Sequence, residues 1–289
     1  MNIPFTSRER DLFVARLADQ FGLLFEEHRH RVLDAAVSQR MRRCGTESAA
    51  AYAQQIDNNA DELDRLVDAA TNNLSRFFRN PGQLSAIVDF VVPSLDKRTG
   101  PDGRQAEASL PEARRPESTR PLRIWVAGCA TGEEPYTLAM VLSDQLPALQ
   151  GFHISATDIS TRALGVARQG SYPTKAVRGI PDGVRTRHFT EQGGHVLVSE
   201  SIRHRVSFVR HNLIDPPPVR EVDLILCRNV LTYLTPDARI QAVAHLRESI
   251  SEGGFLFIGN SETLPRQSGF TVTRTPEARF YRRSCRSPR

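Results

Sequence analysis

Residues 122–135 read LRIWVAGCATGEEP and contain the transition that decides the fold. The first six, Leu122 to Ala127, are mostly apolar and have the pattern of a buried strand. The glycine-containing loop that follows leads directly into a helix expected over 134–146. A strand followed at once by a helix is the repeating unit of an α/β sheet. This stretch therefore predicts an open sheet with a ligand crevice at the carboxyl end of its first strand.

The same alternation continues through the rest of the chain. Strands are predicted over 152–157, 206–210, 222–227 and 255–259 and within 270–281, and helices over 160–168 and 236–249. Near-continuous apolar strands separated by helices indicate a mostly parallel sheet covered on both faces. Between residues 187 and 205 the alternation breaks around Gly193 and Gly194, which predicts a small antiparallel β insert.

The first 96 residues follow a helical period instead, with apolar residues at three- and four-residue steps. Gly22 and Gly45 mark expected helix ends. Residues 97–120 combine Gly, Pro and charge with almost nothing to bury, which is typical of a flexible linker. We therefore predict an all-helical domain over 1–96, the linker over 97–120, and an α/β domain over 121–284.

Composition and charge narrow the class of protein. The chain has 289 residues, 39% hydrophobic and 25% charged, with a formal net charge of +5. No apolar run is long enough to cross a bilayer and the start lacks a signal-peptide pattern, so we expect a soluble cytoplasmic protein. A net positive charge suggests nucleic acid as a possible partner class. However, segment 279–289 holds five arginines and no acid, which equals the whole net charge. This favours a protein partner with an acidic face and predicts no nucleic-acid binding.

Cysteine and histidine spacing gives no sign of a metal site. The cysteines are Cys44, Cys129, Cys227 and Cys285, with no CxxC spacing, and the eight histidines form no HExxH motif. We therefore predict neither a metal nor a disulfide framework, and reduced thiols in a cytosol.

Acidic residues follow the first two strands of the predicted sheet. Glu133 and Glu134 open a helix where a pyrophosphate would need the bare positive end, and the loop is not GxGxxG, which disfavours a dinucleotide. Carboxylates there suit an ammonium group and hydroxyls, as in S-adenosylmethionine. Asp158 follows the second strand, where nucleoside-binding folds place a ribose-binding acid. Each of these acids also has a purely structural interpretation. Glu133 and Glu134 would then be first-turn acids favoured by the helix dipole, and Asp158 or Ser160 would cap the next helix.

Four motifs occur in sequence order: NLSRFFR at 73–79, TGEEPY at 131–136, ATDI at 156–159, and CRNV at 227–230 with Tyr233. Together they resemble the motifs of the CheR-type chemotaxis receptor methyltransferases. The resemblance implies a Rossmann-like S-adenosylmethionine-dependent methyltransferase domain behind a small helical domain. It also implies methyl transfer from S-adenosylmethionine to glutamate side chains of chemoreceptors, with S-adenosylhomocysteine as the second product.

The resemblance also assigns cofactor-binding residues. Asn73, Ser75 and Arg79 would reach the cofactor from the helical domain, and Glu134 and Asp158 would hold its methionine and ribose portions. Further contacts are expected from Asn212 and Leu213 beside the adenine, and from Arg228 and Asn229 in the crevice. The family usually has Thr where this chain has Ser75, and an acid where it has Asn80.

The catalytic candidates are Arg79 and Tyr233. A glutamate carboxylate is already anionic at pH 7, so its methylation needs no general base, and the sequence offers no obvious one. The reaction needs a carboxylate oxygen held about 3 to 3.5 Å from the methyl carbon in a site that excludes water. Arg79 suits a carboxylate or the cofactor, and Tyr233 could border the methyl or orient the substrate. The alternative interpretations are that Arg79 is a solvated arginine and that Tyr233 is a packing residue.

Substrate-binding candidates lie on the helix expected over 28–44. Arg31 and Arg42 fall together on the side opposite Leu33 and Val37, so they face solvent or a partner. The resemblance implies that this basic helix meets the acidic methylated helices of a receptor's cytoplasmic domain, and that the insert docks a receptor tail in some members. We also expect a monomer that does not insert into the membrane.

Two other functions compete with receptor methylation. One is a catalytically lapsed S-adenosylmethionine-binding signalling or scaffold protein, suggested by Asn80 and the long linker. The other is a nucleic-acid or small-molecule methyltransferase, suggested by the basic charge.

Overall fold

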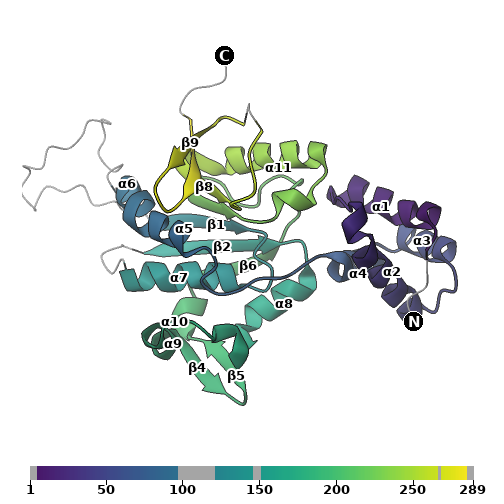
Figure 1. Ribbon diagram of the computed structural model, residues 1–289, viewed down its shortest axis with the longest axis horizontal. Helices are drawn as coiled ribbons and strands as arrows, with labels where there is room; N and C mark the ends of the chain where they lie inside the picture. Colours follow the sequence, from purple (N-terminus) through teal and green to yellow (C-terminus); the bar gives the residue numbers. More distant parts are fainter. Residues whose placement is uncertain (1–4, 97–120, 146–150, 266–267, 285–289) are drawn as a thin grey trace, which may run out of the picture.

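A computed structural model describes residues 5–96, 121–145, 151–265 and 268–284, in which a helical unit lies beside an α/β unit (Figure 1). The linker predicted over 97–120 lies outside these residues. Within them, no helix is both long enough and apolar enough to span a membrane. The described cysteines, at 44, 129 and 227, are free thiols.

The helical unit is built from amphipathic helices with side-chain caps. Its helices are α1 Ser7–Phe21, α2 His30–Cys44, α3 Ala49–Asp57 and α4 Ala60–Ala70. Thr6 caps α1 in a capping box with Glu9, because each side chain bonds the other's backbone N–H. Gly22 and Gly45 end α1 and α2 in the left-handed region, as predicted. A 3₁₀ turn over Glu27–Arg29 precedes α2, which therefore begins two residues later than predicted.

The α/β unit contains a seven-stranded sheet in the order β6-β2-β1-β7-β8-β10-β9. Its strands are β1 Leu122–Ala127, β2 Phe152–Asp158, β6 Val206–Arg210, β7 Val222–Cys227, β8 Ile250–Ile258, β9 Phe270–Arg274 and β10 Arg279–Arg283. The covering helices include α7 Glu133–Gln145, α8 Thr161–Gln169 and α11 Pro236–Ser249. All strand pairs are parallel except those of β10 with β8 and β9, so the predicted mostly parallel sheet is confirmed.

The central strand β1 lies between β2 and β7, with Ala127 opposite Thr157 and Val126 opposite Leu226. Its last four residues are buried, because helices cover both faces of the sheet. Trp125 donates its indole N–H to Thr157 Oγ1 at 2.9 Å, which satisfies a polar atom inside the core. The loops that follow β1, β2 and β7 therefore meet at one edge of the sheet.

The antiparallel insert forms a separate three-stranded sheet in the order β3-β5-β4. Its elements are β3 Ser171–Pro173, α9 Asp182–His188, β4 Phe189–Gln192, β5 His195–Val198 and α10 Glu200–Arg203. The hairpin around Gly193 and Gly194 confirms the predicted insert. The prediction began too late, however, because the three-residue strand β3 is too short to show an alternating pattern.

Residues 81–96 pack on the sheet and not in the helical domain, where their apolar period had predicted them. They form α5 Pro81–Ala86, a π-helix over Ile87–Val91 and α6 Val92–Asp96 (Figure 1). Ile87 and Val91 share a core with Ile124 and Val126 of β1. An amphipathic period reveals a buried face but not the core that buries it, so the sequence pattern did not separate this segment from α1 to α4.

The helical unit and the other face of the sheet share a single hydrophobic core. At the junction, Leu23 pairs with Leu234 in an isolated antiparallel bridge. Leu24 donates its backbone N–H to the carbonyl of Tyr233 at 2.7 Å, and Thr235 donates to Gly22 at 2.8 Å. The two units are therefore joined by main-chain hydrogen bonds as well as by packing.

Polar contacts join a second pair of surfaces between the two units. Arg210, at the end of β6, forms an ion pair with Asp64 of α4. The backbone N–H of Arg162 donates to Asp68 Oδ1 at 3.3 Å, and its guanidinium donates to the Asp68 carbonyl at 3.2 Å. Helix α4 is thereby held beside α8 and β6.

Candidate functional site

A cavity of about 230 Å³ lies at the carboxyl ends of β1, β2 and β7. The helical unit and the segment that connects α4 to α5 complete its wall. All of the predicted cofactor and catalytic residues line it: Asn73, Ser75, Arg79, Glu134, Asp158, Asn212, Leu213, Arg228, Asn229 and Tyr233. Arg31 and Arg42 do not; both are exposed on α2.

The loop after β1 is braced by Asp158. Gly128 and Cys129 donate backbone N–H groups to the Thr157 carbonyl at 2.7 and 2.9 Å. Ala130, in the left-handed region at φ 47°, donates to Asp158 Oδ2 at 2.8 Å. Burial raises the pKa of Asp158, while the backbone hydrogen bonds that it accepts oppose that rise. The carboxylate thus orients the loop as well as lining the cavity.

Ser160 is the N-cap of α8, because its Oγ accepts from the backbone N–H of Ala163 at 3.1 Å. Asp158 Oδ1 accepts from the backbone N–H of Ser160 at 2.9 Å. The sequence had left the cap open between these two residues, and the structure gives it to Ser160. Asp158 supports the cap and also faces the cavity.

We predict that Gly128→Ala weakens S-adenosylhomocysteine binding about tenfold or more. Gly128 has φ 79°, and an added Cβ would lie 2.3 Å from Val230 Cγ2 on the cavity wall. Gly194 has the same φ but open space around an added Cβ. Gly194→Ala therefore carries the same backbone strain as Gly128→Ala but not the clash with Val230. The clash alone costs about 1 to 3 kcal/mol. Calorimetric titration and thermal unfolding of both variants test this; equal affinities would contradict it.

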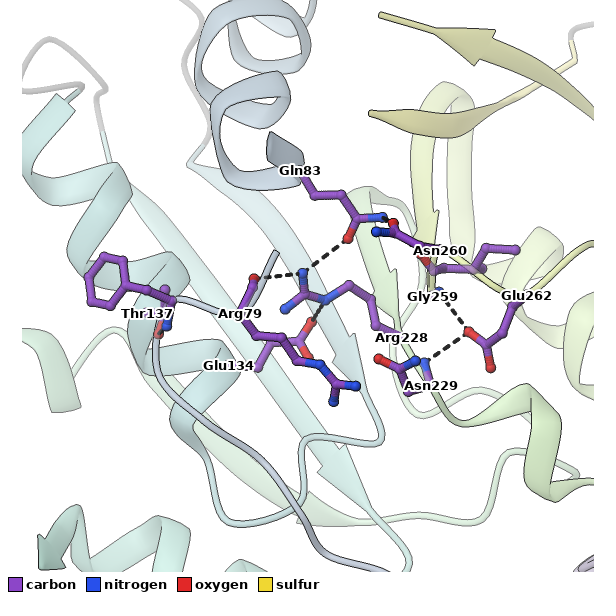
Figure 2. A network of polar contacts seen from close by, with 11 residues as sticks. Arg79, Gln83, Glu134, Thr137, Arg228, Asn229, Gly259, Asn260 and Glu262 are labelled. Atoms are coloured by element: carbon purple, nitrogen blue, oxygen red, sulfur yellow. Dashed lines mark hydrogen bonds and ion pairs between the residues drawn. The ribbon is translucent and has the colours of Figure 1, made fainter. Parts of the chain in front are cut away.

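Arg228 links three parts of the site (Figure 2). Its Nε donates to Glu134 Oε1 at 2.7 Å, and its Nη1 donates to Gln83 Oε1 at 3.0 Å and to the Arg79 carbonyl at 3.2 Å. The Arg228 and Glu134 side chains are 3% and 12% exposed. Glu134 is thus more than a solvated first-turn acid: it forms a largely buried ion pair with the loop after β7.

Glu262 holds the same loop from the other side (Figure 2). Its side chain is buried, and Oε2 accepts from the backbone N–H groups of Asn229 and Gly259 at 2.9 and 2.6 Å. Oε1 accepts from the backbone N–H of Thr232 at 3.2 Å. Asn229 has φ 58°, a left-handed conformation that these hydrogen bonds maintain. The loop that carries Asn229 and Tyr233 is therefore firmly positioned.

Segment 71–80 crosses the cavity between α4 and α5. Phe77 is buried between the rings of Tyr172 and Phe189, with centroids 5.0 and 5.2 Å away, so it is a packing residue. Phe78, at φ 53°, donates its backbone N–H to Thr137 Oγ1 at 3.1 Å. These anchors hold the adjacent Arg79 at the cavity wall.

Three polar atoms of cavity-lining residues are buried without a partner among the described residues: Thr71 Oγ1, His211 Nδ1 and Asn229 Oδ1. Burial lowers the pKa of His211, and its Nε2 lies 3.1 Å from the Pro216 carbonyl. The neutral ring thus donates from Nε2 and leaves Nδ1 as an acceptor. Unpaired buried polar groups are costly, so the cavity suits a ligand with hydrogen-bonding groups of its own.

S-adenosylmethionine fits these groups. Glu134 and Asp158 suit its ammonium and hydroxyl groups, and the acceptors His211 Nδ1 and Asn229 Oδ1 suit N–H and O–H donors. The Arg79 guanidinium forms no hydrogen bond or ion pair within the described part of the chain, so it is free to bind a carboxylate.

Family models match both units of the chain. Residues 73–278 match the S-adenosylmethionine-binding domain of the CheR methyltransferases, and residues 8–71 match their all-alpha domain. The fold and the cavity therefore define an S-adenosylmethionine-dependent methyltransferase, with S-adenosylmethionine as its cofactor. The chain belongs to the CheR methyltransferase family.

Individual relatives support the same family assignment. The chain is 30% identical to chemotaxis protein methyltransferase 2 of Vibrio cholerae over 284 residues, 95% of this chain and 91% of that protein. It is 32% identical to a chemotaxis protein methyltransferase of Listeria monocytogenes over 213 residues, 74% of each chain. It is also 32% identical over 228 residues, 76% of its length, to an uncharacterized 104.1 kDa protein of Rhodobacter capsulatus, of which it spans 22%.

Residues of the site that the sequence did not reveal include Arg29, Gln83, His211 and Glu262. Arg29 and His211 line the cavity, and Gln83 and Glu262 hold its loops. His211 directly precedes Asn212, which offered a positional signal. The other three lie outside the recognised motifs and act through contacts with residues distant in sequence.

Proposed function

We propose that this protein transfers the methyl group of S-adenosylmethionine to glutamate carboxylates on the cytoplasmic domain of a chemoreceptor-like protein. The observation that carries the proposal is the position of the helical unit. This unit walls the cofactor cavity, and its helix α2 presents Arg31 and Arg42 on an exposed side. An exposed, arginine-bearing helix in the unit that walls the cavity suits an acidic protein helix.

In this proposal the cavity residues divide into two groups. Asn73, Ser75, Glu134, Asp158, Asn212, Leu213, Arg228 and Asn229 hold the cofactor, directly or through the Arg228 ion pair. Arg79 reaches the cofactor and binds its carboxylate beside the reaction site, and Tyr233 borders the reacting groups. The Tyr233 side chain is half-buried, and its hydroxyl lies 3.4 Å from Asn72 Nδ2, a contact that orients the ring.

The chemistry needs no proton transfer. When bound, S-adenosylmethionine supplies a methyl group activated by a positively charged sulfur. A glutamate carboxylate is ionised at pH 7, so one of its oxygens can attack the methyl carbon directly. The new C–O bond forms as the C–S bond breaks, and the bonding electron pair stays on sulfur. The protein's task is to align the acceptor oxygen and exclude water.

Labelled methyl transfer tests the proposal. The purified protein is incubated with methyl-labelled S-adenosylmethionine and receptor cytoplasmic fragments of the source organism, and the product is treated with mild base. The expected result is label that base releases and that is lost when the acceptor glutamates are changed to alanine. Tight S-adenosylhomocysteine binding without transfer to any receptor would instead indicate a lapsed enzyme. Base-stable label in RNA or DNA would indicate a nucleic-acid methyltransferase.

A further inference from the structure

Arg29 lies on the cavity wall and comes from the helical unit. Its guanidinium carbon is 4.6 Å from the ring centroid of Phe25 and 4.5 Å from that of Tyr233. Its Nη1 donates to the Leu24 carbonyl at 2.7 Å. The rings and the carbonyl fix the orientation of the guanidinium plane.

One edge of this guanidinium is open. In this chain Arg10, Arg16 and Arg40 each bind a carboxylate through Nε and Nη2. Nε and Nη2 of Arg29 form no hydrogen bond with any described residue, and neither is among the buried unpartnered atoms. The edge that binds carboxylates elsewhere in the protein is therefore accessible at the cavity.

Two cations of the cavity wall have no carboxylate partner. Among the described residues, the guanidiniums of Arg29, Arg79 and Arg228 line the cavity, together with the carboxylates of Glu134 and Asp158. Arg228 is neutralised by Glu134, whereas neither Arg29 nor Arg79 forms an ion pair within the described ranges. S-adenosylmethionine carries one carboxylate, so it can pair with only one of these two. A half-buried cation next to aromatic faces interacts more strongly with an anion than a solvated one does.

The two free guanidiniums lie in different surroundings. Arg79 extends beside the Arg228–Glu134 pair, at the first turn of α7 (Figure 2). Arg29 lies against Tyr233, where the helical unit meets the loop after β7. Arg29 is thus on the side of the cavity that the proposed substrate-facing unit forms.

We propose that Arg29 binds the carboxylate of the acceptor glutamate through Nε and Nη2. Stacking of its guanidinium on the Tyr233 ring orients both side chains toward the acceptor. The inference rests on the proposed function and deepens it by naming a residue that selects a carboxylate substrate. Burial lowers the pKa of Arg29, yet a guanidinium remains charged at neutral pH, so the site holds its charge throughout the working range.

The test compares Arg29→Met, Arg29→Lys and the control Arg8→Met, an exposed residue of α1 outside the cavity. Methyl transfer to a receptor fragment gives kcat and KM for the receptor, and calorimetry gives the Kd for S-adenosylhomocysteine. Loss of a charge-assisted pair predicts about a 30-fold lower kcat/KM for the receptor in Arg29→Met. The Kd should stay within about twofold of wild type, since the cofactor contacts are intact.

Arg29→Lys keeps the charge but not the planar fork, so it should recover part of the lost kcat/KM. Arg8→Met should match wild type, and thermal unfolding should show all variants folded. The proposal is overturned if Arg29→Met leaves receptor kinetics unchanged, if it weakens S-adenosylhomocysteine binding as strongly as receptor turnover, or if Arg29→Lys is no better than Arg29→Met. Wild-type protein that methylates no receptor would overturn the proposed function itself, and this inference with it.

Discussion

Arg79→Ala is expected to lower kcat/KM for methyl transfer about 100-fold while leaving the protein folded. The Arg79 side chain lines the cavity and bonds no described residue, whereas its backbone carbonyl accepts from Arg228. Truncating the side chain therefore leaves the Arg228 network intact. What disappears is a charge-assisted contact to a carboxylate, worth about 1.5 to 3 kcal/mol and about 1.4 kcal/mol per tenfold in rate.

Arg76→Ala is the matched control, because Arg76 is an exposed arginine on the same segment with no cavity contact. Steady-state kinetics, S-adenosylhomocysteine titration and thermal unfolding would be measured for both variants. Arg79→Lys should restore part of the activity through its charge. Turnover of Arg79→Ala equal to that of Arg76→Ala would remove Arg79 from the proposed site.

Glu62→Ala is expected to destabilise the protein by about 3 to 5 kcal/mol, the usual cost of breaking a buried ion pair by removing one partner. The Glu62 side chain is only 2% exposed. It accepts from Arg40 Nε at 2.8 Å and Nη2 at 2.6 Å, and from the Tyr52 hydroxyl at 2.9 Å. The substitution leaves the Arg40 guanidinium and the Tyr52 hydroxyl buried without their acceptor.

The exposed pair in the same unit is the control for Glu62→Ala. Arg16 binds Asp57 with the same two-pronged geometry, both contacts at 2.7 Å, but the Asp57 side chain is 47% exposed. Asp57→Ala should therefore cost about 1 kcal/mol or less. Urea unfolding of both variants measures the difference; similar losses would contradict the role assigned to burial.

Glu62 also predicts a pH dependence. Burial would raise the pKa of Glu62, but hydrogen bonds from Arg40 and Tyr52 outweigh it, so the folded-state pKa lies below the ordinary value. A carboxyl with a lowered folded-state pKa stabilises the fold above its unfolded pKa, and that stability is lost as pH falls through the folded value. The difference in the free energy of unfolding between wild type and Glu62→Gln should accordingly shrink below about pH 4.

Local pattern was sufficient for the elements that build the sheet. The strands at 122–127, 206–210 and 222–227 and the helix at 236–249 have the predicted bounds, because short apolar runs between turn residues leave few alternatives. The cavity residues that were predicted share a related signal. Each follows a strand, belongs to a recognised motif, or both, and the carboxyl ends of neighbouring parallel strands meet at one edge.

Tertiary pairing decided what the sequence did not reveal. Helices α5 and α6 show an apolar period that would fit either core, and only the folded chain shows that they cover the sheet. Glu262 accepts backbone hydrogen bonds from residues up to 33 positions away, and Arg29 acts through a ring that approaches from the other unit. No local spacing encodes such contacts.

The Leu23–Leu234 bridge has a consequence for protein engineering. The helical unit appears in sequence as an exchangeable cassette, bounded near residue 71 by its family model. Yet its Gly22–Leu24 backbone pairs with Tyr233–Thr235, so it helps to hold the segment that carries Tyr233. A chimera that takes residues 1–71 from a relative with another substrate preference must match residues 230–235 as well. Specificity and turnover would otherwise change together, because both depend on the Leu23–Leu234 junction.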